Sequence, residues 1–440
     1  MAAVMEATRT AARDLVRDET PARLRLLASL TAGAAAALLL VTGLVMDTVQ
    51  DQVRVIGHQA APLAATSADL YFALSDLDAQ ATRILLAGDA DALAGSRLDA
   101  LGAYRERGRQ VDADLRDVLT ISAGSPEQRL VTDLLDGLAV YRQRIGQALA
   151  AQEQAARTTG PATPAGRLSD DALGYYTQAT TVLHERLLLD AQRLRATSEE
   201  RLTRAYEAKT STESAGGFFA VLLGTALLIL LVLSQVWLAR RFRRTWNPAL
   251  IAATAISLFL VVAVTAVLGA QGSRLTEARA GGLQPYLELS ELRAVGSDAA
   301  ADTSRYVVSG NLAYYRDDFT GKSTLLTVGD LDSLAGAEAV RRWAAYRDSH
   351  ERILGLADDG RTAEAVTALT GIRRGDAAFD FAYFDAAVAT VTDARRLEFD
   401  RGLRAAESSL TGAVTVPVVA LVLVIVLVAL GVRRRLAEYR

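Results

Sequence analysis

The sequence predicts an all-α membrane protein in which four transmembrane helices carry two tandem extracytoplasmic four-helix bundles, related as a parallel internal repeat. Three observations predict this fold class: four long apolar stretches, an uneven distribution of arginine, and short motifs that recur at a constant spacing. The predicted segments are a cytoplasmic N-terminal segment (1–25), span one (26–46), bundle 1 (47–216), span two (217–239), a cytoplasmic loop (240–248), span three (249–270), bundle 2 (271–411), span four (412–432) and a cytoplasmic tail (433–440).

Each apolar stretch has about 20 residues with no charge near its centre, and a helix of that length crosses the roughly 30 Å hydrocarbon core of a bilayer. Transporters and channels usually carry ionisable groups or broken helices within the membrane, so these spans disfavour transport. Pro417 is the clear irregularity in span four. It predicts a kink or hinge there, with a proline that the membrane helix simply tolerates as the alternative.

Arginines cluster on one side of the apolar stretches. They are Arg9, Arg13, Arg17, Arg23 and Arg25 before span one, Arg240, Arg241, Arg243 and Arg244 in the short loop, and Arg433, Arg434, Arg435 and Arg440 in the tail. Cytoplasmic flanks are enriched in Lys and Arg, so both termini and the loop are predicted inside and both large domains outside a multi-pass protein of the cell membrane. Span one is predicted to be a retained signal anchor rather than a cleaved signal peptide.

The segment 47–216 has the periodicity of long helices. Leucine, alanine and isoleucine recur at alternating spacings of four and three residues from Leu70 to Ile84, as in the seam of a helical bundle. This first helix is expected to continue out of span one, interrupted only by Pro62. Further helices are expected to end near Ile121 and Ala156, and a last one to begin near Ser169 and run into span two. Four such helices predict an up-and-down bundle.

The second half of the chain repeats the first. Sliding the sequence by 222 positions aligns span one with span three. It also aligns Ser75-Asp76 with Ser297-Asp298, Thr82-Arg83 with Ser304-Arg305, and Gly88-Asp89 with Gly310-Asn311. Because each half has two spans, the two copies are predicted to point the same way across the membrane.

Candidate site residues come from this repeat. Asp76 and Arg83, and likewise Asp298 and Arg305, are seven residues apart and share one helix face. They predict structural ion pairs, or alternatively an arginine that holds the carboxylate of a ligand. The three histidines are isolated from one another and there is no cysteine, so we expect no metal site, no cofactor and no catalytic residue. The net charge of −3 gives no reason to expect a nucleic-acid partner.

Little of the sequence is predicted to be cytoplasmic. The three predicted cytoplasmic segments are too short to fold a kinase, a cyclase or another signalling domain, so we expect a non-enzymatic protein whose output passes to a separate effector. Arg240, Arg241, Arg243, Arg244, Arg433, Arg434 and Arg435 are the candidate contacts to that effector. The alternative is that each of them only sets the topology and contacts lipid head groups.

The two outer segments resemble the four-helix ligand-binding domains of bacterial chemoreceptors and sensor kinases, in which an element like residues 358–365 (DDGRTAEA), a short turn followed by a helix, is common. The whole architecture resembles the GlnX-type four-span membrane signalling proteins of actinobacteria. In that family the membrane protein connects an amino-acid-binding lipoprotein outside to a serine/threonine kinase inside, which implies an extracytoplasmic solute-binding protein and a cytoplasmic kinase as partners here. Two alternatives remain: direct sensing of a small ligand by the bundles, and a structural or transport-accessory role.

Overall fold

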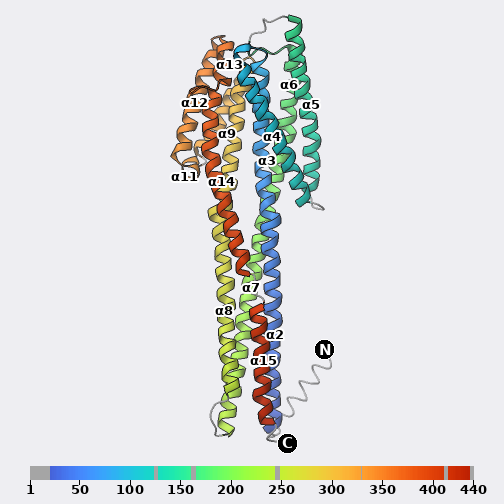
Figure 1. The fold of residues 1–440 in the computed structure, drawn as a ribbon, viewed down its shortest axis with the longest axis vertical. Coiled ribbons are helices and arrows are strands. Elements are labelled where there is room, and N and C mark those ends of the chain that lie inside the picture. The colour runs from blue at the N-terminus through green and yellow to red at the C-terminus, as the bar shows by residue number, and fades with distance from the viewer. Residues whose placement is uncertain are drawn as a thin grey trace. The chain divides into compact units, whose positions relative to one another are not determined.

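The computed structural model describes residues 20–122, 127–159, 165–242, 248–328, 330–410 and 415–436, and these ranges are helical almost throughout, with no strand in them (Figure 1). The chain divides into two compact units. We call the first the apolar unit (Met1–Ile56, Arg204–Glu277 and Arg401–Arg440) and the second the polar unit (Gly57–Thr203 and Ala278–Asp400).

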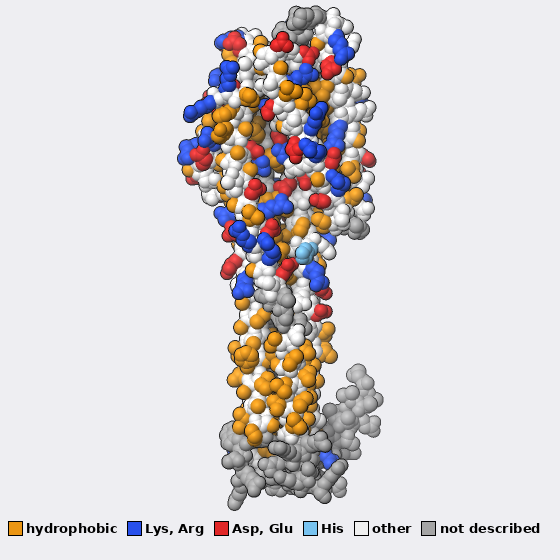
Figure 2. Space-filling model, in the orientation of Figure 1, with side chains coloured by type: hydrophobic (Ala, Val, Ile, Leu, Met, Phe, Trp, Pro, Cys, Tyr) orange, Lys and Arg blue, Asp and Glu red, His pale blue; other side chains and the backbone are white. Residues whose placement is uncertain are grey.

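The apolar unit contains the predicted spans. Its helices are α2 (Thr20–Val55), most of α7 (Leu188–Phe242), α8 (Pro248–Ala278), the end of α14 (Ala377–Leu410) and α15 (Thr415–Leu436). Figure 2 shows hydrophobic side chains gathered on the visible face of this unit, and many large ones are exposed, such as Leu40, Phe218 and Phe259. An exposed apolar surface of this extent is suited to lipid rather than water.

Three continuous helical segments are long and apolar enough to cross a membrane: Arg25–Ala87, Asp170–Arg240 and Pro248–Val308. The fourth predicted span appears as a shorter apolar helix, Thr415–Gly431, within the described residues, while 411–414 lie outside them. Three spans therefore follow from the helices, and the fourth stays a prediction. Pro417 is in the first turn of α15, where the backbone N–H groups have no partner within the helix, so it interrupts no hydrogen bond there.

The long helices change their winding at one point each. α2 passes through the π-helical turn η1 (Ile56–Ala60) into α3 (Ala61–Ala87), and Pro62 is the second residue after that turn. α8 passes in the same way through η4 (Arg279–Leu283) into α9 (Gln284–Val308), and Pro285 follows. A wide π turn is one way for a helix to accommodate a proline, which cannot donate to the preceding turn. Each helix thus continues past its proline. The sequence predicted the continuation out of span one, but the interruption that it placed at Pro62 is only a change to π-helical winding.

Bundle 1 has nearly the helices that the sequence predicts. After α3 come η2 (Asp91–Leu93), α4 (Ala94–Ile121), α5 (Glu127–Thr159), α6 (Asp170–Val182), the π turn η3 (Leu183–Leu187) and the start of α7. α3 ends where Gly88 takes a positive φ of 52°, a conformation that favours glycine. α6 begins after Ser169, whose hydroxyl accepts a hydrogen bond from the amide of Ala172 at 3.3 Å.

The second segment has more helices than the four predicted. They are α9, α10 (Ala313–Val328), α11 (Leu331–Ala335), α12 (Ala337–Asp358), α13 (Thr362–Thr370) and α14. The short helices α11 and α13 are the additions, and they exist because Gly336 and Gly360 adopt positive φ and break the helical path beside them. Residues 358–365 do form a turn followed by a helix, α13.

The two segments pack into one unit rather than forming two separate bundles. α3 packs along α9, while α4 covers α3 and α10 covers α9 (Figure 1). One hydrophobic core runs through both segments and includes Leu74 and Leu77 from the first and Trp343 and Phe384 from the second. α3 and α9 are therefore buried on nearly all sides, so any polar residue on them needs a partner inside the protein.

Candidate functional site

The contact between α3 and α9 contains a buried arginine with three carboxylates. The Arg305 guanidinium lies 2.7 Å from Asp78 Oδ2, 2.9 Å from Asp298 Oδ1 and 2.7 Å from Asp302 Oδ1. The side chains of Arg305, Asp78 and Asp302 have no exposed surface. Asp78 comes from α3 and the other three residues from α9, so this ion pair ties the first half of the polar unit to the second.

Lys322 on α10 completes this cluster. Its Nζ lies 2.6 Å from Asp298 Oδ2, 2.6 Å from Asp302 Oδ2 and 2.7 Å from Asp318 Oδ2. Burial would lower the pKa of Lys322, but the carboxylates of Asp298 and Asp302 raise it instead. The two cations leave every carboxylate of the cluster with at least one positive partner.

The carboxylates of the cluster titrate differently. Burial alone would raise the pKa of Asp298, yet the Arg305 guanidinium and Lys322 hold it well below its ordinary value. Burial raises the pKa of Asp302 to about 6, because the neighbouring charge of Asp298 opposes part of what Arg305 and Lys322 provide. Of these two carboxyls, Asp302 is therefore the one that takes up a proton more readily.

Hydroxyl groups hold the other side of the cluster. Tyr141 donates a hydrogen bond to Asp78 Oδ1 at 3.0 Å, and Tyr176 and Thr82 share a hydrogen bond of 2.9 Å beside it. Burial raises the pKa of Tyr141 and of Tyr176, so both remain neutral donors. The polar groups at the centre of the unit are thus largely satisfied by one another.

The first repeat arginine has a poorer set of partners. Asp298 and Arg305 form the predicted ion pair, but Asp76 and Arg83 do not contact each other. Asp76 instead receives hydrogen bonds from Arg107 Nε at 2.7 Å and from Gln80 Nε2 at 2.9 Å. Arg83 donates to Gln80 Oε1 at 2.8 Å, and its nearest carboxylate oxygen, Asp99 Oδ2, is 3.5 Å away.

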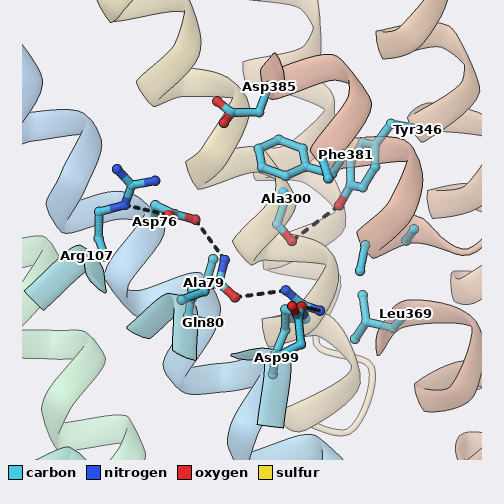
Figure 3. Close-up of a pocket in the computed structure, with 16 residues that line it drawn as sticks. Asp76, Ala79, Gln80, Asp99, Arg107, Ala300, Tyr346, Leu369, Phe381 and Asp385 are labelled. Atoms are coloured by element: carbon cyan, nitrogen blue, oxygen red, sulfur yellow. Dashed lines mark hydrogen bonds and ion pairs between the residues drawn. The ribbon is translucent and has the colours of Figure 1, made fainter. Parts of the chain in front are cut away.

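Arg83 lines a cavity of about 250 Å³ within the polar unit. Asp76, Gln80, Asp99 and Arg107 border it on the side of α3 and α4 (Figure 3). On the opposite side, Figure 3 shows these lining residues: Ala300 of α9, Tyr346 of α12, Leu369 of α13, and Phe381 and Asp385 of α14. The cavity is therefore built from both segments of the chain.

The Arg83 side chain is only 15% exposed, and its Nε has no hydrogen-bond partner among the described residues. Burial lowers the pKa of Arg83, and Asp99 and Asp76 compensate only in part. A buried donor without an acceptor is unfavourable by about 1–3 kcal/mol, and more for a charged group. The cavity therefore presents a cation whose hydrogen-bonding capacity the protein leaves partly unused.

The structure describes only some of the arginines predicted to contact an effector, together with the predicted hinge Pro417. Arg240 is exposed near the end of α7. The side chains of Arg241, Arg243, Arg244, Arg433, Arg434 and Arg435 lie outside the described residues. Pro417 lies where α15 meets α2 and lines a small gap together with Met46 and Thr42. Its role as a hinge stays a prediction.

Sequence reasoning missed Asp78, Asp302 and Lys322. Asp302 precedes Arg305 by one helical turn, a spacing that suits an ion pair, and Lys322 is one of only two lysines in the chain. Asp78 directly follows Leu77 in the apolar stripe of α3, so a charge at a largely buried position was the available signal.

Residues 52–207 match the family model of the actinobacterial sensor domain. The matched range includes Asp76, Asp78 and Arg83 and extends from the end of α2 into α7. No curated protein and no solved structure matches the chain. The match supports a sensing or signalling role for this chain, as a sensor protein of actinobacteria.

Proposed function

We propose that the protein is a non-enzymatic transmembrane signal relay. The polar unit senses a condition outside the cell, the apolar unit carries the response through the membrane, and the basic cytoplasmic ends pass it to a separate protein. The sensor-domain match at residues 52–207 supports the sensing role, and the apolar helices support a location in the membrane.

One observation carries the proposal. The helical segments Arg25–Ala87 and Pro248–Val308 each run without a break from an apolar stretch into α3 and α9, the two helices that Asp78 and Arg305 join. Packed helices adopt a small number of discrete arrangements, so a change at the α3–α9 contact can favour one arrangement over another. A continuous helix can carry that shift or rotation along its own axis.

The proposed topology follows from the arginines. We place both termini and the loop 240–248 in the cytoplasm, the polar unit outside the cell, and residues 412–432 across the membrane as a fourth span. The proposed internal repeat is supported by two matched features. Gly88 and Gly310, 222 residues apart, both take a positive φ at the end of a helix. Pro62 and Pro285, 223 residues apart, are each the second residue of the α-helix that follows a π turn.

The finer form of the proposal follows the resemblance to GlnX-type proteins. In this form a solute-binding lipoprotein that reports amino-acid availability docks on the polar unit, and a serine/threonine kinase binds the arginine-rich ends. The four apolar stretches of the sequence, three of which form helices long enough to cross a membrane, and the short basic segments beside them support it. A second candidate, direct sensing of a small molecule, is favoured by the cavity beside Arg83.

A photo-crosslinking residue at position 240 tests the relay in intact cells. We expect it to capture a cytoplasmic protein, and we expect the yield to change when amino acids are supplied to starved cells. The control carries the same residue at position 44, on an exposed apolar face of α2 that should meet lipid. If position 240 captures no cytoplasmic protein, or captures one at the same yield whatever the medium contains, the relay is refuted.

A further inference from the structure

We infer that the cavity beside Arg83 binds the carboxylate of a small organic acid, in the place that a carboxylate of the protein occupies at Arg305. The binding site would lie between α3 and α4 on one side and α9, α12 and α14 on the other. This inference names a ligand class for the sensing role proposed above, although the binding itself can be measured on the isolated protein.

Arg83 and Arg305 differ in the partners that the chain gives them. In the register of the proposed 222-residue repeat, Arg83 corresponds to Arg305 and Asp76 to Asp298. Gln80 then corresponds to Asp302, so one of the three carboxylates of Arg305 is replaced by a neutral amide beside Arg83. Asp76 is retained, but it bonds Arg107 and Gln80 instead of Arg83.

The third carboxylate of the Arg305 site, Asp78, also has no counterpart beside Arg83, and a cavity lies there instead. Arg305 of α9 takes Asp78 from α3. In the same register, the counterpart of Asp78 is position 300 of α9, which is an alanine. Arg83 and Ala300 both line the cavity of about 250 Å³. The carboxylate that would complete the site is therefore absent from the protein, and a cavity lies beside both residues.

The surroundings of Arg83 leave room for a hydrogen-bond acceptor from a ligand. Its Nε is buried without a hydrogen-bond partner among the described residues, as is Nε of Arg305. The two arginines differ at their terminal nitrogens, which contact three carboxylates at Arg305 and one at Arg83. The carboxylate nearest to Arg83, Asp99, is 3.5 Å away and 59% exposed, so this contact is weak. The planar guanidinium suits a carboxylate, because its parallel N–H donors match two oxygens.

The walls of the cavity define the rest of the ligand. The rings of Phe381 and Tyr346, the side chain of Leu369 and several alanines provide an apolar surface. Asp76, Asp99 and Asp385 also border the cavity, and they disfavour a ligand with a second negative charge. Asp385 is held by Arg293 and Asp76 by Arg107, so neither of these arginines is left to bind another anion. A compact monocarboxylate with an apolar body fits these surroundings, and the small volume excludes a peptide.

Titration calorimetry on the full chain in lipid nanodiscs tests the inference. The probes are acetate, isobutyrate, benzoate, phenylacetate, leucine and phenylalanine, each paired with its amide. We expect at least one acid to bind with one site per chain and its amide to bind at least about tenfold more weakly. In Arg83→Gln, the affinity for the acid should fall by about tenfold or more. Arg109→Gln, which removes an exposed arginine of α4, should leave binding unchanged.

A second pair of variants keeps the test valid if Arg83→Gln does not fold. Ala300→Asp supplies the missing carboxylate, so it should abolish acid binding and give a higher unfolding temperature than Ala300→Asn, which has nearly the same size without the charge. The inference is overturned if none of the acids binds, if amides bind as tightly as acids, if Arg83→Gln binds as the unchanged chain does, or if Ala300→Asp is no more stable than Ala300→Asn.

The same measurements separate this site from the relay. If an acid binds the purified chain but the crosslinking yield at position 240 does not change, the carboxylate site is supported and the relay is contradicted. If the yield changes in cells but no acid binds the purified chain, the relay is supported and the carboxylate site is contradicted.

Discussion

Arg305 and Arg83 are both buried arginines, yet the protein supplies their counter-charges in very different amounts. Arg305 contacts three carboxylates, and its pKa is raised because Asp298, Asp78 and Asp302 outweigh the cost of burial. The pKa of Arg83 is lowered because burial outweighs its partners. At the scale of single residues, one arginine joins two helices through close carboxylates, and the other has a single carboxylate at 3.5 Å.

Asp78→Asn should destabilise the protein strongly. The variant removes one carboxylate from a fully buried arginine, and breaking a buried ion pair of this kind costs about 3–5 kcal/mol. The exposed pair of Glu106 and Arg109 is a matched control, because Glu106→Gln should change the free energy of unfolding by less than about 1 kcal/mol. Denaturant unfolding in detergent measures both. Equal stability of the two variants would show that the Arg305 cluster does not hold the helices together.

The raised pKa of Asp302 predicts a pH dependence. The folded protein retains the Asp302 proton up to about pH 6, whereas the unfolded chain releases it near its ordinary value of 3.8. In this window the folded state binds more protons, so the contribution of Asp302 to stability falls as the pH rises from about 4 to 6, by roughly 2–3 kcal/mol. Asp298, Arg305 and Lys322 face Asp302, and Asp78 faces it across Arg305.

Comparison with Asp302→Asn isolates this effect. As the pH rises from 4 to 6, the unfolding free energy of the unchanged chain should fall relative to that of Asp302→Asn. The lowered pKa of Asp298 acts in the opposite direction, because its contribution is lost as the pH falls below about 4, but it is present in both proteins. A difference that stays constant over this range would refute the pKa assigned to Asp302.

At the scale of elements, glycines allow the helices of the apolar unit to approach closely. A Cβ on Gly216 of α7 would come within 2.3 Å of Val45 Cγ1 of α2, and one on Gly224 of α7 would come equally close to Val261 Cγ2 of α8. Valine is branched at Cβ and has little freedom to move away. Small residues at helix contacts are a usual way to pack helices in a membrane. α7 therefore contacts both α2 and α8 through positions without a side chain.

Gly216→Val should destabilise the packing of α7 against α2, by roughly 1–3 kcal/mol as for other overpacked sites. Gly217→Val is the matched control, since nothing lies within 4 Å of its Cβ position and the change in helix propensity is the same. Thermal unfolding in detergent compares the two. A control variant as unstable as Gly216→Val would mean that the loss comes from the glycine itself and not from the contact.

The sequence predicts individual helices better than it predicts how they pack. The end of α4 at Ile121 and the start of α6 after Ser169 follow from local signals, periodicity and a capping serine, and the structure has both. The packing of α3 along α9 was not predicted, because it joins residues such as Asp78 and Arg305, which are 227 positions apart. Each half was therefore assigned its own bundle, and the buried partners Asp78 and Lys322 were missed. The 222-residue spacing did single out Asp76, Arg83, Asp298 and Arg305, but it carried no information on which of them would meet.

At the scale of the whole molecule, the proposed relay requires one orientation of the chain in the membrane, with the polar unit outside the cell. The chain has no cysteine, so single cysteines can report it cleanly. A membrane-impermeant maleimide should label Glu153→Cys, at an exposed position of α5, in intact cells. It should label Thr245→Cys, in the short basic loop, only after the cells are permeabilised. The reverse pattern would place the polar unit in the cytoplasm and contradict the proposed topology.

The central claim is that the state of the α3–α9 contact reaches the cytoplasmic ends of the helices. Spin labels on cysteines at positions 240 of α7 and 430 of α15 allow pulsed electron-spin resonance to measure a distance within the apolar unit. Well below the unfolding temperature, we predict that Asp78→Asn shifts this distance distribution and that Glu106→Gln does not. An unchanged distribution in folded Asp78→Asn would contradict the account.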